Sequence, residues 1–268
     1  MMKKIMLLLA LIITNYIQAS KTHSIAVNSA AMGKTIPVLV IVPEKTTAKN
    51  KYPVIYILHG YSGNPQRTLS QDIPSLIQRA DTDQIIFVLP DGGFNSWYVN
   101  SPIDESIQYE TFISKELPSY TDAHFPIKKG PKNCGLLGWS MGGFGTLTIG
   151  SQHPEVFGIL GSMCGVIDFR DYVKEYAIDK VLGVDGFVWQ QYLVASRITA
   201  LKTSGQRILL DCGTEDPLAQ QNRQFHDLLV QHKILHDYVE YPGNHNAAYW
   251  SQAALMQLDF FKRFFDEK

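Results

Sequence analysis

The sequence predicts an α/β protein in which a mainly parallel sheet is covered by helices on both faces. Two observations lead to this fold class. Short runs that are almost continuously apolar, such as residues 53–58 and 85–89, recur along the chain and are typical of strands buried on both faces. Between and after these runs lie segments whose apolar residues recur at helical spacing. Strands that alternate with helices in this way form parallel sheets.

The predicted elements follow one another along the chain after residue 20. Apolar and β-rich runs predict strands at residues 24–28, 36–42, 53–58, 85–89, 134–137, 159–163, 207–212 and 238–241, with a turn at 31–34 between the first two. Helical spacing predicts helices around residues 109–117, 141–152 and 221–231. It also predicts a terminal amphipathic helix that carries Leu255, Leu258, Phe261 and Phe265.

Residues 166–200 interrupt this order. Aromatic and charged residues are mixed there without the rhythm of the flanking segments. We expect this stretch to be a small insertion or lid over the functional site. The sequence has no internal repeat or low-complexity segment, and its length suits one domain, which we place at residues 20–268.

The first residues have the pattern of a secretory signal peptide. Lys3 and Lys4 precede an uncharged apolar run at residues 5–13, and a small residue, Ala19, follows the polar stretch after it. A run of this length is too short for a membrane-spanning helix, which needs about 20 apolar residues. We therefore expect residues 1–19 to be removed and the protein to be secreted or periplasmic, without stable insertion in a membrane.

Composition excludes several classes of function. Hydrophobic residues make up 45% of the chain and charged residues 18%, as in an ordinary globular protein, and the formal net charge is -1. No basic stripe is present, so nucleic acid is not an expected partner. The chain has an odd number of cysteines, and their spacing is not that of metal ligands; they are Cys134, Cys164 and Cys212. We expect no disulfide framework, no metal site and no cofactor.

The strongest chemical signal is the segment from Gly138 to Gly143, which reads Gly-Trp-Ser-Met-Gly-Gly. It matches Gly-x-Ser-x-Gly, the nucleophile elbow of the α/β-hydrolase fold, in which a sharp turn lifts a serine hydroxyl off a strand end. An apolar strand precedes the motif and a small-residue helix start follows it, which is the setting the elbow requires. Ser140 is therefore the predicted nucleophile.

A serine nucleophile needs a base within hydrogen-bond reach and a carboxylate that holds the base. In this fold the acid and then the histidine follow the serine along the chain. Asp216 lies beyond the end of the strand at 207–212, where it can point at the site, and the adjacent Glu215 is the alternative acid. His245 lies in a loop between the last strand and the terminal helix, so we predict it as the base.

The oxyanion formed during acyl transfer needs two backbone N–H donors in this fold. Met141 follows the nucleophile at a helix N-terminus and is the first expected donor. The second is expected from the loop at residues 59–64, at Tyr61. His59, in the same loop, is expected to have a structural role.

Taken together, these motifs resemble an esterase family of the α/β-hydrolases that includes feruloyl and acetylxylan esterases, tributyrin-type esterases, S-formylglutathione hydrolase and the mycolyltransferases. The resemblance spans roughly residues 35–265, and it includes the segments 90–98, 213–216 and 243–245 as well as the elbow. It implies the same catalytic residues as the reasoning above. It further implies that the loop at 91–98 lines the substrate pocket, with Trp97 as a wall against the substrate.

The resulting hypothesis is a serine esterase that works through an acyl-enzyme and takes a small-molecule or oligosaccharide ester as its substrate. Export and the resemblance to carbohydrate esterases suggest short-chain, acetyl or feruloyl esters of carbohydrates, by analogy of fold. The alternative is an acyltransferase of the same fold that passes the acyl group to a sugar or lipid alcohol. A peptidase is a further reading of the same fold.

Overall fold

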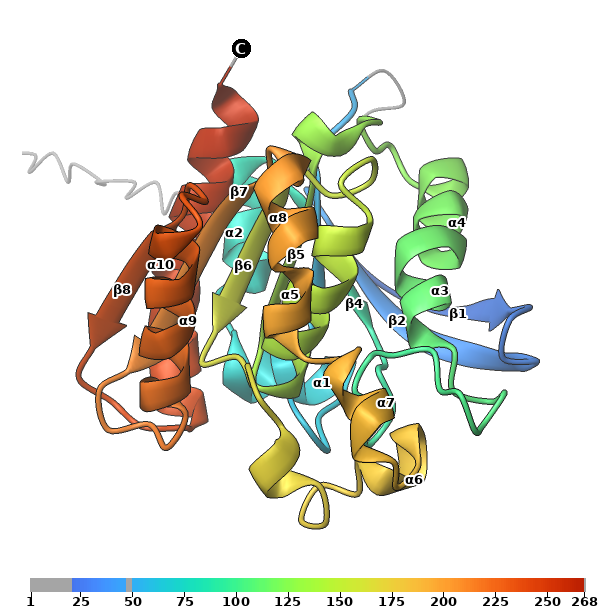
Figure 1. The fold of residues 1–268 in the computed structure, drawn as a ribbon. Helices are drawn as coiled ribbons and strands as arrows, with labels where there is room; N and C mark the ends of the chain where they lie inside the picture. Colours follow the sequence, from blue (N-terminus) through green and yellow to red (C-terminus); the bar gives the residue numbers. More distant parts are fainter. Residues whose placement is uncertain (1–20, 47–49, 268) are drawn as a thin grey trace, which may run out of the picture.

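The computed structural model describes residues 21–46 and 50–267, which form an eight-stranded sheet between two layers of helices (Figure 1). The strands are β1 (Lys21–Ser29), β2 (Lys34–Val42), β3 (Val54–Leu58), β4 (Ile86–Pro90), β5 (Cys134–Trp139), β6 (Ile159–Met163), β7 (Arg207–Gly213) and β8 (Asp237–Tyr241). The predicted signal peptide at 1–19 lies outside the described residues. None of the described helices is long and apolar enough to cross a membrane.

The sheet is mixed but mainly parallel, with the strand order β1-β2-β4-β3-β5-β6-β7-β8. The β1–β2 hairpin and the β2–β4 pair are antiparallel, whereas every pairing from β4 through β8 is parallel. The parallel strands therefore end at one common edge of the sheet. In open α/β sheets a ligand binds at this carboxyl edge.

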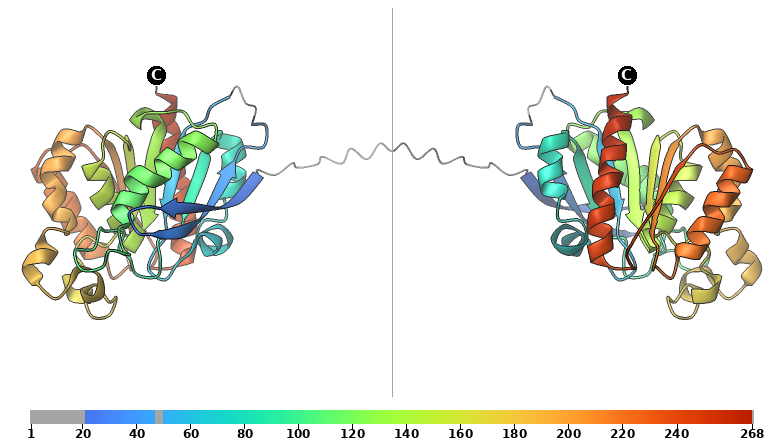
Figure 2. Two further views of the ribbon diagram at one scale, coloured as in Figure 1. Left: turned by 90° about the vertical axis from the view of Figure 1, so that its right-hand side faces the viewer. Right: turned by 90° about the vertical axis from the view of Figure 1, so that its left-hand side faces the viewer.

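Helices cover both faces of the sheet (Figures 1 and 2). One face is packed against α3 (Tyr109–Thr111), α4 (Leu117–His124), α5 (Met141–Gln152), α8 (Ile198–Ser204) and α9 (Ala219–Gln231). The other face is packed against α2 (Leu76–Asp83) and the long α10 (Ala247–Asp266). The short helices α1 (Pro65–Arg67), α6 (Asp179–Leu182) and α7 (Gly186–Gln190) lie at the carboxyl edge.

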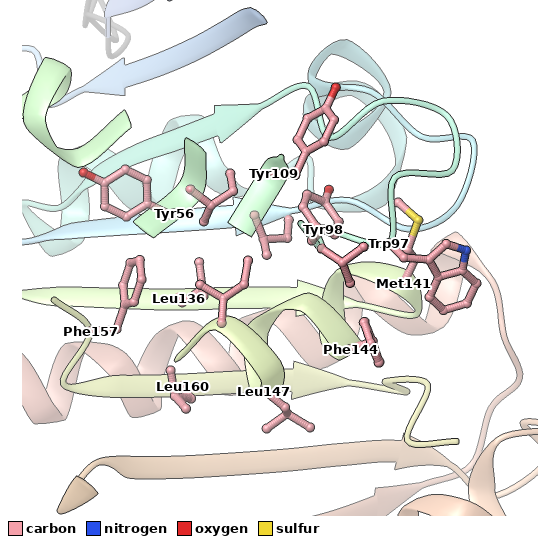
Figure 3. Packing of buried hydrophobic residues seen from close by; sticks show 14 of the residues in the cluster. Tyr56, Trp97, Tyr98, Tyr109, Leu136, Met141, Phe144, Leu147, Phe157 and Leu160 are labelled. Atoms are coloured by element: carbon pink, nitrogen blue, oxygen red, sulfur yellow. The ribbon is translucent and has the colours of Figure 1, made fainter. Parts of the chain in front are cut away.

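Alternation along each central strand divides the apolar residues between two cores. In β3, Tyr56 points into the core beneath α5, whereas Ile55 and Ile57 point into the core beneath α10. Figure 3 shows the first core, in which Tyr56 packs against Phe157 at one end and Phe144 of α5 lies near Trp97 at the other. All five residues of β3 are buried, which explains why the strand reads as a continuous apolar run.

The observed elements confirm the predicted fold class. Helix α5 and strand β6 have the predicted bounds, and the other strands differ from prediction by a few residues at their ends. The predicted helix around 109–117 extends to His124 and contains a π-helical turn at Phe112–Glu116. Helix α2 was not predicted, because only Leu76 and Ala80 of its residues are buried.

The expected insertion is present between β6 and α8. It consists of the short helical segments Arg170–Tyr172, α6, α7 and Val194–Arg197, joined by loops. These segments lie at the carboxyl edge of the sheet, below the strand ends in Figure 1. The insertion therefore borders the region where the loops after the parallel strands meet.

Candidate active site

The nucleophile elbow has the local geometry that its sequence predicts. Ser140 separates β5 from α5 and adopts φ 56° and ψ -121°, a conformation that L residues rarely occupy. A Cβ on Gly142 would overlap the Leu58 carbonyl oxygen, and one on Gly138 would overlap the Gly142 carbonyl. Glycine at these two positions is therefore what lets the elbow approach β3.

The structure brings Ser140, His245 and Asp216 together from the ends of three different strands. His245 Nε2 lies 2.9 Å from Ser140 Oγ, and His245 Nδ1 lies 2.8 Å from Asp216 Oδ2. An ionised carboxylate can accept hydrogen bonds but cannot donate them, so the proton of this bond lies on His245 Nδ1. Nε2 is therefore left free to accept the serine proton. Asp216 is 4% exposed, and its other oxygen accepts the Leu218 N–H at 2.8 Å.

The alternative acid, Glu215, is exposed, and its backbone N–H donates to the Gly243 carbonyl. The geometry therefore selects Asp216 as the partner of His245. Within the described chain, Cys164, Asp216 and His245 are the group whose ligand atoms lie close enough to hold a metal ion, within 4.8 Å of one another. Since Asp216 and His245 already hydrogen-bond to each other, this cluster is the histidine–acid pair with a buried thiol beside it.

The three cysteines are free and buried among the described residues. Cys134 begins β5, Cys164 follows β6, and Cys212 lies in β7. Burial raises the pKa of the Cys164 thiol well above its usual value, so this thiol stays protonated beside the acid.

Asp211 is a second buried carboxyl group close to the site. It is fully buried in β7, where it accepts hydrogen bonds from Tyr249 Oη at 2.9 Å and Gln257 Nε2 at 2.6 Å. Burial raises the pKa of Asp211 to about 7, and the negative charge of Asp216 adds to the rise. Tyr249 also packs against Gly243, in the loop that carries His245, so Asp211 braces this loop through α10.

The predicted oxyanion donors lie on either side of Ser140. Met141 is the first residue of α5, where a helical N–H has no partner inside the helix. Tyr61 follows Gly60, whose Cα approaches so closely that an added Cβ would lie 3.3 Å from Ser140 Cβ. Both residues line the same cavity as Ser140 and His245. The geometry is therefore compatible with two N–H donors at one carbonyl oxygen.

His59 holds the loop that carries Tyr61. Its Nδ1–H donates to the Gly60 carbonyl at 2.8 Å, and its Nε2 accepts the Gly92 N–H at 2.8 Å. The imidazole thus joins the loop after β3 to the loop after β4. This contact matches the expected structural role, because neither nitrogen is free to reach a substrate.

The cavity over Ser140 has a volume of about 200 Å³. Trp97 lines it, as expected, but is 2% exposed and packs edge-on against Phe144 and Tyr176. Figure 3 shows Trp97 beside Met141 at the end of the core that faces the site. Trp97 has φ 53°, so its loop turns sharply to place the indole in this wall.

Several lining residues were not identified from the sequence. Tyr172 and Tyr176 come from the insertion, Trp250 comes from α10, and Arg67 and Asp72 come from the segment after the Tyr61 loop. None of them belongs to a motif. The irregular composition of 166–200 was the signal that led us to expect a lid, but it did not single out individual tyrosines.

Comparisons with known proteins agree with this site. Residues 29–260 match the family model described as Putative esterase. An acetyl esterase of Caldicellulosiruptor saccharolyticus is 26% identical over 247 residues, which is 84% of this chain and 91% of the relative. An esterase of Mycobacterium tuberculosis is 30% identical over 250 residues, 81% of this chain; there the match spans only 54% of the relative's length.

The fold is similar to that of solved structures. The fluorophosphonate-binding serine hydrolase F of Staphylococcus aureus superposes with a TM-score of 0.81 and 22% sequence identity, over 91% of this chain and 99% of that one. This likeness concerns the fold. The family match covers most of the chain and includes the elbow, the acid loop and the histidine loop. The chain therefore belongs to the Putative esterase family of α/β-hydrolase enzymes and is a carboxylic ester hydrolase.

Proposed function

We propose that Ser140, His245 and Asp216 hydrolyse carboxylic esters of carbohydrates through a covalent acyl-enzyme. The observation that carries the proposal is the continuous chain of contacts from Asp216 Oδ2 through the His245 imidazole to Ser140 Oγ. An alcohol becomes a useful nucleophile at neutral pH when an oriented imidazole takes its proton. This chain of contacts supplies that base and its orienting carboxylate.

In the first half-reaction His245 Nε2 takes the Ser140 proton while Oγ attacks the ester carbonyl carbon. The N–H groups of Met141 and Tyr61 stabilise the resulting oxyanion, assisted by the positive end of the α5 dipole. The imidazolium is stabilised by Asp216 and then donates its proton to the leaving alcohol oxygen. The products are a Ser140 acyl ester and the free alcohol.

In the second half-reaction water takes the place of the alcohol. His245 removes a proton from the water, the hydroxide attacks the acyl-enzyme, and Ser140 leaves with the proton that His245 returns. The carboxylic acid is released. The small volume of the cavity, about 200 Å³, favours a short acyl chain or one flat ring over a long lipid chain.

Two observations support a carbohydrate as the alcohol. Aromatic side chains line the cavity, which suits the apolar faces of sugar rings; they are Tyr61, Trp97, Trp139, Tyr172, Tyr176 and Trp250. A relative that this chain matches over 91% of the relative's length is named an acetyl esterase. We therefore propose acetyl or feruloyl esters of sugars as the substrate class.

The Ser140→Ala variant tests the nucleophile. We expect it to lose at least about 10³-fold of the kcat for p-nitrophenyl acetate, because the proton-transfer chain then has no nucleophile to activate. Ser251→Ala is a matched control, since this serine lies on α10 and its hydroxyl donates a hydrogen bond to the Ala248 carbonyl, away from the cavity. Undiminished hydrolysis by Ser140→Ala, with both variants folded by circular dichroism, would remove Ser140 from the mechanism. A panel of acetyl, butyryl and feruloyl esters then defines the acyl group.

A further inference from the structure

Three side chains that line the cavity over Ser140 each carry a buried polar atom that has no hydrogen-bond partner in the described part of the chain. The atoms are Asp72 Oδ1, Arg67 Nε and Trp250 Nε1. Most buried polar groups in proteins are paired, because an unpaired one loses its hydration without compensation. Three of the eleven such atoms in the described chain belong to residues of this one cavity, which makes them candidates for pairing with a ligand.

These atoms come from two elements that pack together. Asp72 ends the π-helical turn Thr68–Asp72, and Arg67 directly precedes that turn. Arg67 Nε lies 3.5 Å from Asp72 Oδ1, an ion pair without a hydrogen bond. Trp250 lies in the first turns of α10, which packs against the same turn. The three side chains thus form a small polar region within a cavity whose other walls are mostly aromatic or aliphatic.

Asp72 is the central group of this region. It is 1% exposed, and it also lines the cavity, so a ligand in the cavity is its natural partner. Burial raises the pKa of Asp72 above its usual value, although the Arg67 guanidinium opposes the rise. The ion pair with Arg67 offsets part of the cost of burying this carboxyl group, but Oδ1 still lacks a hydrogen-bond donor among the described residues.

One of the three side chains, Trp250, lies beside the imidazole that protonates the departing alcohol. The Trp250 ring packs edge-on against His245, with ring centres 5.3 Å apart. His245 Nε2 must protonate the leaving alcohol oxygen, so the alcohol of the bound ester lies next to this imidazole.

The set of atoms selects the chemistry of the alcohol. A carboxylate oxygen accepts hydrogen bonds, whereas Arg67 Nε and Trp250 Nε1 donate them. A phosphate would bring its negative charge against the Asp72 carboxylate, and an ammonium group would leave both donors unpaired. Neighbouring hydroxyl groups both donate and accept, so they satisfy all three atoms. A sugar ring supplies such hydroxyls together with apolar faces for the adjacent aromatic rings.

We propose that Asp72, Arg67 and Trp250 form a hydroxyl-binding subsite that receives the sugar alcohol of the ester. The inference rests on the proposed esterase function and adds the residues that determine alcohol specificity. The subsite acts by binding hydroxyls that do not react. Its contribution therefore appears as discrimination between two alcohols of similar shape rather than as general activity.

The test compares two acetates whose leaving groups are both secondary alcohols on six-membered rings. One is a monoacetylated methyl xyloside, and the other is cyclohexyl acetate, which lacks the neighbouring hydroxyls. We expect kcat/KM of the wild-type enzyme to favour the sugar ester by at least about tenfold, because a site built for hydroxyls rejects a ligand without them. Glycerol monoacetate is a third substrate that separates a sugar from a small acyclic polyol.

Two variants assign this preference to residues. Trp250→Phe removes the indole N–H and keeps an aromatic ring, and Asp72→Asn removes the carboxylate charge at nearly constant volume. We expect each to lower the ratio of the two kcat/KM values by about tenfold, with the larger loss for Asp72→Asn because its hydrogen bonds involve a charge. Trp189→Phe is the matched control. Trp189 Nε1 donates to the Gly183 carbonyl at 2.9 Å, outside the cavity, so the ratio should stay the same.

The outcomes separate this proposal from the proposed function. If the wild type does not prefer the sugar ester, or if the ratio changes less than twofold in both variants, the subsite is wrong while Ser140-dependent hydrolysis stands. A preference for glycerol monoacetate over the sugar ester also overturns it. If Asp72→Asn does not fold, Trp250→Phe alone decides. Ester hydrolysis that persists in Ser140→Ala counts against the esterase mechanism instead.

Discussion

Ser140 combines a strained backbone with neighbours that hold it in place. Its N–H donates to the Met163 carbonyl at 3.1 Å, and its own carbonyl accepts the Val166 N–H at 3.2 Å. Both bonds come from the end of β6 and the residues just after it, on the strand next to β5. A residue keeps an unfavourable conformation only where its surroundings fix it. The nucleophile is therefore positioned before any ester arrives.

Asp211 is expected to make the stability of the folded protein depend on pH. Its pKa is about 7 in the folded protein, whereas an unfolded aspartate titrates near 4. The folded state thus binds the proton more tightly, and this contribution to stability is full below about pH 4 and is lost as the pH rises through 7. Its nearest polar and ionisable neighbours are Tyr249, Gln257, Asp216 and the Cys164 thiol.

We expect Asp211→Asn to remove this loss, because an amide cannot ionise. The difference in the free energy of unfolding, variant minus wild type, should therefore increase between pH 5 and pH 8. The increase should be up to a few kcal/mol, at about 1.4 kcal/mol for each unit of pKa shift. Gln257 Oε1 has no partner among the described residues. If the Gln257 amide rotates, this oxygen can accept a hydrogen bond from the new N–H of the asparagine. Urea unfolding at both pH values measures the difference; an equal effect at pH 5 and pH 8 would contradict the shift.

The sequence allowed the reacting residues to be found because each has a recognisable local setting. Ser140 has its glycines, and His245 lies between the last strand and the terminal helix. Asp216 was the predicted acid, and Glu215 stayed its alternative because adjacent residues in a loop differ only in the direction of their side chains. Asp72 and Arg67 were missed for a further reason. They reach the cavity through a π-helical turn that has no pattern of its own.

At the scale of elements, α5 and α2 explain what periodicity can and cannot predict. Helix α5 is buried at eleven of its twelve residues, so it shows no amphipathic pattern; the adjoining motif predicted its start. Helix α2 is short and largely polar, and it ends at Gln84 in a left-handed conformation without glycine. It therefore lacks both the long apolar stripe and the usual C-terminal signal.

The contact between the elbow and β3 leaves no space for a side chain on Gly142. In Gly142→Ala the added methyl group meets two backbone groups, Leu58 and His59, which cannot rotate away. We expect a loss of about 1–3 kcal/mol in stability, as in other overpacked cores, together with loss of esterase activity. Gly186→Ala is the control, since its new Cβ would lie 3.8 Å from the nearest atom, in Trp189. Similar melting temperatures for the two variants would disprove the steric argument.

At the scale of the whole molecule, the parallel order of β3 to β8 assembles the site. The loops after β3, β4, β5, β7 and β8 contribute Tyr61, Trp97, Ser140, Asp216 and His245, respectively. Ser140 and His245 are 105 residues apart along the chain. Their meeting follows from parallel strands that end at one edge, which the alternation of strands and helices predicted. The strand order itself is not encoded in any local pattern.

Export is a property of the whole chain and is tested independently of catalysis. Residues 1–19 lie outside the described structure, and we propose that they direct the protein across a membrane. Fused to alkaline phosphatase, which is active only outside the cytoplasm, they should give active enzyme in a bacterial host. Leu8→Arg should abolish that activity, because a charge within the apolar run costs about 2.5–3.5 kcal/mol on insertion. Equal activity with and without this substitution would argue against a signal peptide.

Because all three thiols are buried, the rate at which they react with a reagent reports how often the folded structure opens. Cys134 lies at the amino end of the parallel strands, and Cys164 and Cys212 lie towards the opposite end. A maleimide reagent cannot reach them while both cores are closed, so labelling proceeds only as fast as the molecule opens. Peptide mapping of the label then shows which end of the sheet opens first. Movement of the insertion alone would leave Cys134 unlabelled.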